Sequence, residues 1–264
     1  MTYNSFDYQV RDGIGTVTFA RPATLNSLTF EVYGELERLA WECQTDERVR
    51  VLVITGSGKG FCSGGDVHEI IGELITRDAK GMLEFTRMTG AVTRNLRMLE
   101  KPVIAAINGT CTGAGTVLAL AADFRLASDQ AKFAFQFTKV GLTGADMGMA
   151  YLLPRVVGFG RATELLMLGN TIDAFTAERY GLLNRVVPHA DLMDETTRLA
   201  GRLAEGPSHA LGMTKRMLEH EWNMDLLGAI EAEAQAQALL LMGEDHKEFY
   251  RAFTEKRPPT FMGR

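Results

Sequence analysis

Two apolar runs, each followed by a glycine-rich segment and then by a helical pattern, constrain the fold of this sequence most strongly. The first run, 49–55, leads into 58–66, and the second, 102–107, leads into 108–115. Apolar runs of this kind are typical of strands covered on both faces, and their alternation with helices predicts an α/β core. Glycine lets the backbone approach a ligand closely, and helix N-termini present unpaired N–H donors. Two such donors converging on one oxygen can hold an oxyanion.

Composition excludes several classes of protein. The formal net charge of −5 over 264 residues provides no basic footprint for nucleic acid or for an anionic membrane surface. No apolar run approaches the roughly 18 residues that a membrane span requires. The first residues also lack the basic and apolar regions of a signal peptide. We therefore expect a globular protein without nucleic-acid or membrane partners.

The cysteines and histidines predict neither a disulfide framework nor a metal site. Three scattered cysteines, Cys43, Cys62 and Cys111, have no metal-ligand spacing. None of the five histidines forms a His-x-x-x-His pair. Reduced thiols are typical of a cytoplasmic protein, and this is the expected location.

The remaining pattern indicates a core over residues 1–204 and a helical assembly region over 205–264. Hydrophobic periodicity and turn residues predict the elements. Strands are expected at 14–20, 124–127, 132–135 and 184–188, and helices at 29–43, 78–99 and 115–122. If Phe133, Phe135 and Phe137 share one strand, their rings lie on one face of it.

Three other chemistries of glycine loops find little support. A phosphate-binding loop requires Ser or Thr after its lysine, but Lys59 is followed by Gly60. The first strand is followed by no G-x-G-x-x-G segment, and the G-x-S-x-G sequence of serine hydrolases is absent. Tight backbone packing remains an alternative explanation for either loop alone.

Together the loops resemble those of the enoyl-CoA hydratase/isomerase family, also called crotonases. Residues 60–66 resemble the signature loop of that family, and 108–115 resemble its second loop. Residues 21–27 match its CoA-binding turn, and segments 133–158 and 255–259 also fit. The resemblance covers nearly the whole chain. It implies a spiral of repeated β-β-α units, with C-terminal helices that assemble a homotrimer or a dimer of trimers.

The resemblance also implies an acyl-CoA thioester substrate and no cofactor, since coenzyme A is part of the substrate. Two backbone amides hold the thioester oxygen, and the matching positions are Ser63 and Ala114. Because alanine replaces the usual glycine at 114, the backbone there raises the question of a positive φ. Further positions implied to contact the acyl-CoA are Ala23, Leu25, Gly64, Gly65, Asp66, Val67, Thr110, Gly113, Phe137 and Thr138.

The acid/base positions depart from the family pattern. Val117 and Phe137 stand where typical hydratases carry glutamates, so the two-glutamate mechanism cannot be transferred. Asp146 matches the functional aspartate of dienoyl-CoA isomerases and related ring-processing enzymes. In an apolar pocket its pKa would be raised by desolvation, which suits proton transfer. The alternative is that Asp146 caps a helix at 147–152.

The other carboxylates have structural interpretations. Asp66, with Glu69 three residues later, is typical of a helix cap. Glu69, Glu73, Asp78 and Glu84 are typical of a solvated helix face, although one of them could supply a second carboxylate. We therefore expect an enoyl-CoA hydratase or hydratase-like lyase that uses Asp146. The alternatives are a double-bond isomerase or an enzyme on cyclic or aromatic CoA esters, and a non-catalytic acyl-CoA-binding protein.

Overall fold

Two sheets form the core of the protein in a computed structural model that describes residues 2–263. The larger sheet has the order β1-β2-β3-β5-β7-β10, and the smaller has the order β4-β6-β8-β9. The larger consists of β1 (Phe6–Arg11), β2 (Ile14–Phe19), β3 (Val51–Gly56), β5 (Val103–Ile107), β7 (Phe124–Ser128) and β10 (Arg185–Val187). The smaller consists of β4 (Gly60–Cys62), β6 (Thr110–Thr112), β8 (Lys132–Ala134) and β9 (Thr171–Asp173). Only the outer pairs, β1 with β2 and β8 with β9, are antiparallel within the described residues.

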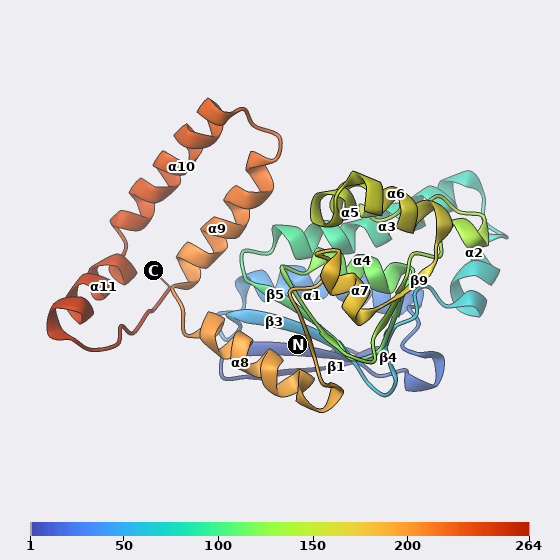
Figure 1. The fold of residues 1–264 in the computed structure, drawn as a ribbon, viewed down its shortest axis with the longest axis horizontal. Coiled ribbons are helices and arrows are strands. Elements are labelled where there is room, and N and C mark those ends of the chain that lie inside the picture. Colours follow the sequence, from blue (N-terminus) through green and yellow to red (C-terminus); the bar gives the residue numbers. More distant parts are fainter. Residues whose placement is uncertain (1, 264) are drawn as a thin grey trace.

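The chain passes from the large sheet to the small one three times in succession. β3 leads to β4, β5 leads to β6, and β7 leads to β8, and parallel pairing joins successive passes. The helices α1 (Phe30–Thr45), α3 (Ala79–Met98) and α4 (Ala114–Ala121) alternate with these passes. This arrangement is the spiral of β-β-α units that the family resemblance implies, and Figure 1 shows it beside the helical C-terminus.

Both faces of the central strands are covered, as their apolar runs require. On one face, Leu52, Ile54 and Ala105 belong to the main core together with residues of α1, α3 and α4. On the other face, Val53 and Ile104 pack in a second cluster with α8 (Leu192–Ala204). Alternation of side chains along a strand explains how one run supplies both clusters.

Local sequence signals define where the main helices begin. Thr29 caps α1 by accepting a hydrogen bond from the Val32 amide, and Asp78 caps α3 by accepting one from the Gly81 amide. Shorter segments complete the core: η1 (Pro22–Thr24), the π-helical η2 (Val67–Ile71), α2 (Gly72–Leu74), η3 (Thr138–Val140), α5 (Met149–Val157), α6 (Phe159–Leu168), α7 (Ala174–Arg179) and η4 (His189–Asp191).

Three C-terminal helices project from the sheets as an arm (Figure 1). They are α9 (Ser208–Glu221), α10 (Leu226–Leu241) and α11 (Glu244–Glu255). Many apolar side chains on the arm are exposed, among them Leu226, Leu227 and Phe253 at 74%, 79% and 73%. Arg50 ties the base of the arm to the core by donating to Gly206 O at 2.7 Å and to Ser208 Oγ at 2.8 Å.

The structure confirms the predicted strands and helices of the core to within a few residues. β8 ends at Ala134, and Phe137 lies beyond it as the residue that precedes η3. The three phenylalanines therefore do not share one strand, although all three are buried. Among residues 2–263, no helix is long and apolar enough to span a membrane.

Candidate active site

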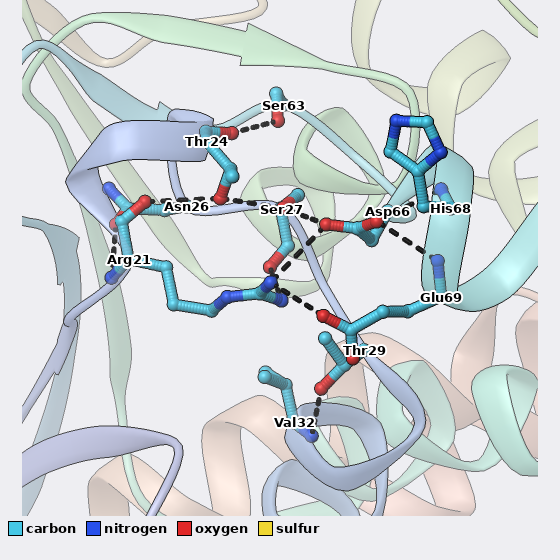
Figure 2. Close-up of polar contacts among 10 residues, drawn as sticks. All are labelled: Arg21, Thr24, Asn26, Ser27, Thr29, Val32, Ser63, Asp66, His68 and Glu69. Carbon is cyan, nitrogen blue, oxygen red and sulfur yellow. Dashed lines mark hydrogen bonds and ion pairs between the residues drawn. The ribbon is translucent and has the colours of Figure 1, made fainter.

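The first glycine loop is held against the turn at residues 21–28 by backbone hydrogen bonds. The Ser63 amide donates to the Leu25 carbonyl oxygen at 2.9 Å. The prediction that Ser63 supplies a free oxyanion donor is therefore wrong, because this N–H already has an acceptor. The Ser63 hydroxyl is also occupied, since it donates to Thr24 O at 2.9 Å (Figure 2).

The neighbouring amide of Gly65 points the other way. Leu28 N–H donates to Gly64 O at 2.8 Å, and Asp66 N–H donates to Leu28 O at 2.8 Å. A trans peptide holds its C=O and N–H antiparallel, so the N–H of Gly65 points away from Leu28. Within residues 2–263, no group accepts a hydrogen bond from this amide. Gly64 adopts φ 95°, a left-handed value suited to glycine.

The second loop presents its amide at the start of α4. Ala114 is the first residue of that helix, and no residue within 2–263 accepts a hydrogen bond from its N–H. The positive φ lies at Gly113, at 52°, so alanine at 114 is unstrained. The loops are in contact, because a Cβ on Gly64 would lie 3.3 Å from Ala114 N. Within the described part of the chain, Gly65 and Ala114 thus each carry an N–H without an acceptor, one on each of the two contacting loops.

Close backbone packing brings α4 against the first loop. A Cβ on Gly115 would lie 2.2 Å from Cys62 O, so only glycine fits there. All eight residues of α4 are buried, and its first turn contains no acidic residue. The partial positive charge of the helix N-terminus is therefore not neutralised by a carboxylate of its own first turn.

Asp146 lies in a sharply turned segment before α5. Its Oδ1 accepts from the Met147 amide at 2.9 Å, and the next two residues, Met147 and Gly148, have φ values of 48° and 88°. Gly148 is the N-cap residue of α5 and makes no side-chain cap, so the alternative in which Asp146 caps this helix is wrong. Burial raises the pKa of Asp146, and the Met147 hydrogen bond opposes this only in part.

Three apolar residues near the loops or Asp146 in sequence belong to the main core. Val117, Phe137 and Met147 are buried in the main core. Tyr33 is also buried, and its pKa is raised by burial first and then by the nearby Cys62 and Asp146. Asp146 is therefore close enough to Tyr33 to influence it electrostatically, as is Cys62 of the first loop. Val117 and Phe137 cannot carry a proton.

The four carboxylates that follow the first loop lie at the protein surface and have protein partners. All four residues are exposed. Glu69 pairs with Arg21 at 2.9 Å, Glu73 pairs with Arg77, and Glu84 lies 3.8 Å from Lys80. Asp78 caps α3. These contacts correspond to the solvated helix face that the sequence favours.

Asp66 is a buried cap. Figure 2 shows its carboxylate accepting hydrogen bonds from the amides of His68 and Glu69 and from the Ser27 hydroxyl, beside Arg21. These partners lower its pKa, the Glu69 amide most strongly. The protein itself therefore uses both oxygens of this carboxylate.

The other expected contact positions differ in their surroundings. The Thr138 hydroxyl donates to the Leu166 and Met167 carbonyl oxygens of α6. Ala23 and Val67 are exposed, and three more positions are partly exposed: Leu25, Thr110 and Gly113. A surface groove of about 680 Å³ lies between α1 and α3. None of its lining residues belongs to either glycine loop.

The two contacting glycine loops and the spiral of β-β-α units define a crotonase-like fold. The chain belongs to the enoyl-CoA hydratase/isomerase family, whose model matches residues 9–264. The 1,2-epoxyphenylacetyl-CoA isomerase of Escherichia coli strain K12 is 35% identical over 255 residues, which are 97% of each chain. The crotonyl-CoA hydratase of Syntrophomonas wolfei is 33% identical over 265 residues and the full length of both chains.

Solved structures agree with this assignment. A protein from Streptomyces coelicolor A3(2) that carries the name enoyl-CoA hydratase has a TM-score of 0.97 and 52% identity to this chain. The match covers 100% of this chain and 96% of that one. Hydratase and isomerase names both occur among the relatives. Family membership alone therefore does not determine which reaction this chain catalyses, and the site residues must be considered.

Proposed function

We propose that this protein is an acyl-CoA enzyme that holds a thioester enolate between the amides of Gly65 and Ala114. Asp146 is its proton-carrying residue, and double-bond isomerisation is the reaction that the site supports best. The observation that carries this proposal is that Asp146 is partly buried, whereas the four carboxylates after the first loop are exposed. Its pKa is raised by burial, while the four carboxylates after the first loop are exposed and paired or capping.

A single carboxylate is sufficient for isomerisation. The ionised Asp146 accepts the proton from the α-carbon of a 3-enoyl thioester, and the electron pair moves onto the thioester oxygen. The two amides stabilise the resulting negative charge, each by roughly 3 kcal/mol. The protonated Asp146 then returns the proton to the γ-carbon, and the double bond forms between the α- and β-carbons. No atom is lost or gained, and the reaction requires no cofactor beyond the coenzyme A of its substrate.

Hydration is the second candidate, supported by relatives named as hydratases. In that reaction Asp146 would take a proton from water while the water oxygen adds to the β-carbon. The proton would then return to the α-carbon of the enolate. The missing glutamates make this route less favourable, because a second group is needed to orient the water.

Incubation in heavy-oxygen water distinguishes the two reactions. We expect a 3-enoyl-CoA to yield the 2-enoyl isomer without label, and crotonyl-CoA to gain little labelled hydroxyl. Rapid labelling of crotonyl-CoA would instead establish hydration. Binding of acyl-CoA with no turnover over straight-chain, cyclic and aromatic esters would contradict both reactions and establish a binding protein.

The arm supports a proposal about assembly. We propose that α9–α11 join copies of this chain into a trimer or a dimer of trimers, because exposed apolar side chains lie along α10 and α11, and Leu218 is exposed on α9. We also place the enzyme in the cytoplasm and assign it to fatty acid metabolism, since its three cysteines are unpaired and its proposed substrate is an enoyl-CoA.

A further inference from the structure

We infer that Asp66 is a positioning residue that sets the direction of the Gly65 amide, an inference that rests on the proposed function. Asp66 directly follows Gly65, and its carboxylate lies in the network of Figure 2. The residue is only 7% exposed, and both carboxylate oxygens are occupied by protein donors. Its contacts therefore act on the loop itself and leave no oxygen for a ligand.

The carboxylate joins three segments of the chain. Oδ1 accepts from the amides of His68 and Glu69, at 3.0 and 3.1 Å, and so begins the π-helical η2. Oδ2 accepts from Ser27 Oγ at 2.8 Å and from the Arg21 guanidinium at 3.3 Å, both on the 21–28 turn. Charge-assisted hydrogen bonds of this kind are about twice as strong as neutral ones.

Arg21 extends the network on its other side. Its guanidinium donates to Ser27 O at 3.2 Å and to Glu69 at 2.9 Å. The turn, the loop and η2 are therefore linked through one buried carboxylate and one partly buried guanidinium. A rotation of the Asp66 side chain breaks its contacts to the turn and to η2 together.

The backbone contacts of Asp66 show why this matters for Gly65. The Asp66 side chain binds Ser27, and its amide binds the adjacent Leu28 O at 2.8 Å. Leu28 in turn donates to Gly64 O, which fixes the peptide plane between Gly64 and Gly65. Glycines on both sides of that plane offer little resistance to rotation. By holding Ser27 next to Leu28, the Asp66 carboxylate restrains this peptide plane against rotation. The Gly65 N–H therefore keeps its direction before substrate binds, as preorganised catalysis requires.

The test compares Asp66→Asn with Asp173→Asn. Asp173 is also an N-cap aspartate, but it begins α7 and belongs to neither loop. Asparagine retains the size of the side chain, loses its charge and replaces one acceptor oxygen with a donor. The readout is the infrared frequency of the thioester carbonyl in bound cinnamoyl-CoA, which falls when amides polarise that oxygen. Steady-state kinetics and thermal unfolding accompany it.

We expect Asp66→Asn to lose most of the carbonyl shift and roughly tenfold or more in kcat, with a smaller change in KM, because the lost amide acts mainly in the transition state. Asp173→Asn should lower the melting temperature and leave the carbonyl shift unchanged. An Asp66→Asn enzyme with a full shift and unchanged kcat would overturn the inference.

If Asp66→Asn fails to fold, Ser27→Ala decides the question. It removes one donor to the same oxygen, and we expect a partial loss of the carbonyl shift, whereas a full shift overturns the inference. Failure of the proposed function would look different. In that case the wild-type protein itself would show no carbonyl shift with any acyl-CoA that it binds.

Discussion

The amide nitrogen of Ser63 lies 2.9 Å from the carbonyl oxygen of Leu25, across the gap between the 21–28 turn and the first glycine loop. This hydrogen bond occupies the donor at Ser63. Two residues further on, the Gly65 N–H points away from the same turn, because Gly64 O is bound by Leu28. The identity of the oxyanion donor therefore depends on which peptide groups the turn engages.

Adjacent substitutions in this loop should have very different effects. Ser63→Ala removes a hydroxyl that contacts only Thr24 O, so we expect kcat within about threefold of wild type and a stability loss of about 1 kcal/mol. Gly64→Ala should reduce kcat by roughly 100-fold, comparable to the loss of one oxyanion donor. At φ 95° its new Cβ would lie 3.2 Å from Thr112 O. Steady-state kinetics and thermal unfolding of both variants check this, and an active Gly64→Ala enzyme would contradict the assignment.

Asp146→Asn should reduce turnover by about 100-fold or more, since general acid–base catalysis contributes 10²–10⁴-fold. Asparagine has the shape of aspartate but cannot accept the substrate proton. The matched control is Glu84→Gln, an exposed residue near Lys80, which should retain wild-type kcat. Full activity of Asp146→Asn on the natural substrate would remove this residue from the mechanism.

The same Asp146→Asn variant should be more stable than wild type at neutral pH. Because burial raises the pKa of Asp146 above its ordinary value of 3.8, the folded wild-type protein holds this proton more tightly than the unfolded chain does. The stabilisation from this proton is fully present below pH 3.8 and is lost as pH rises through the folded-state pKa. Asparagine stays neutral throughout.

Thermal unfolding of both proteins over this pH range provides the measurement. The melting temperature of Asp146→Asn relative to wild type should increase as pH rises from just above 3.8 to neutrality. If the melting temperature of Asp146→Asn relative to wild type decreased as pH rises, the folded protein would stabilise the charged form of Asp146, and the prediction would be wrong.

A substitution on the surface of the arm should change the oligomeric state of the protein but not the stability of its core. Leu227 is 79% exposed on α10, so Leu227→Glu should change monomer stability by no more than about 0.5 kcal/mol. In an apolar interface the new carboxylate would be desolvated, and we expect the variant to dissociate. Light scattering should show a trimer or hexamer for wild type and smaller species for Leu227→Glu.

Lys80→Ala provides the control for assembly. It changes the net charge by the same amount at an exposed position on α3, outside the arm. It should retain the wild-type mass. A wild-type protein that is monomeric at all concentrations, or a Leu227→Glu variant with unchanged mass, would contradict the proposed role of the arm.

The sequence by itself determined the strand–glycine loop–helix units, the helix cap at Asp66, and the resemblance that identifies the family. Periodicity, capping and glycine placement are local signals, read within a few residues of the element they define. Asp146 was also identified from sequence. Its burial and its separation from the α5 cap were not, since both depend on Met147 and Gly148 adopting positive φ values against a packed core.

Only the tertiary structure decided which amides are free and which carboxylates are available. Every residue other than proline carries an N–H, so no local pattern distinguishes Ser63 from Gly65 as a donor. The difference arises from hydrogen bonds to the 21–28 turn, more than 30 residues earlier in the chain. Likewise, the role of Asp66 depends on Ser27 and Arg21. Contacts between distant segments fix the direction of each polar group, and direction determines whether that group holds the fold or faces a substrate.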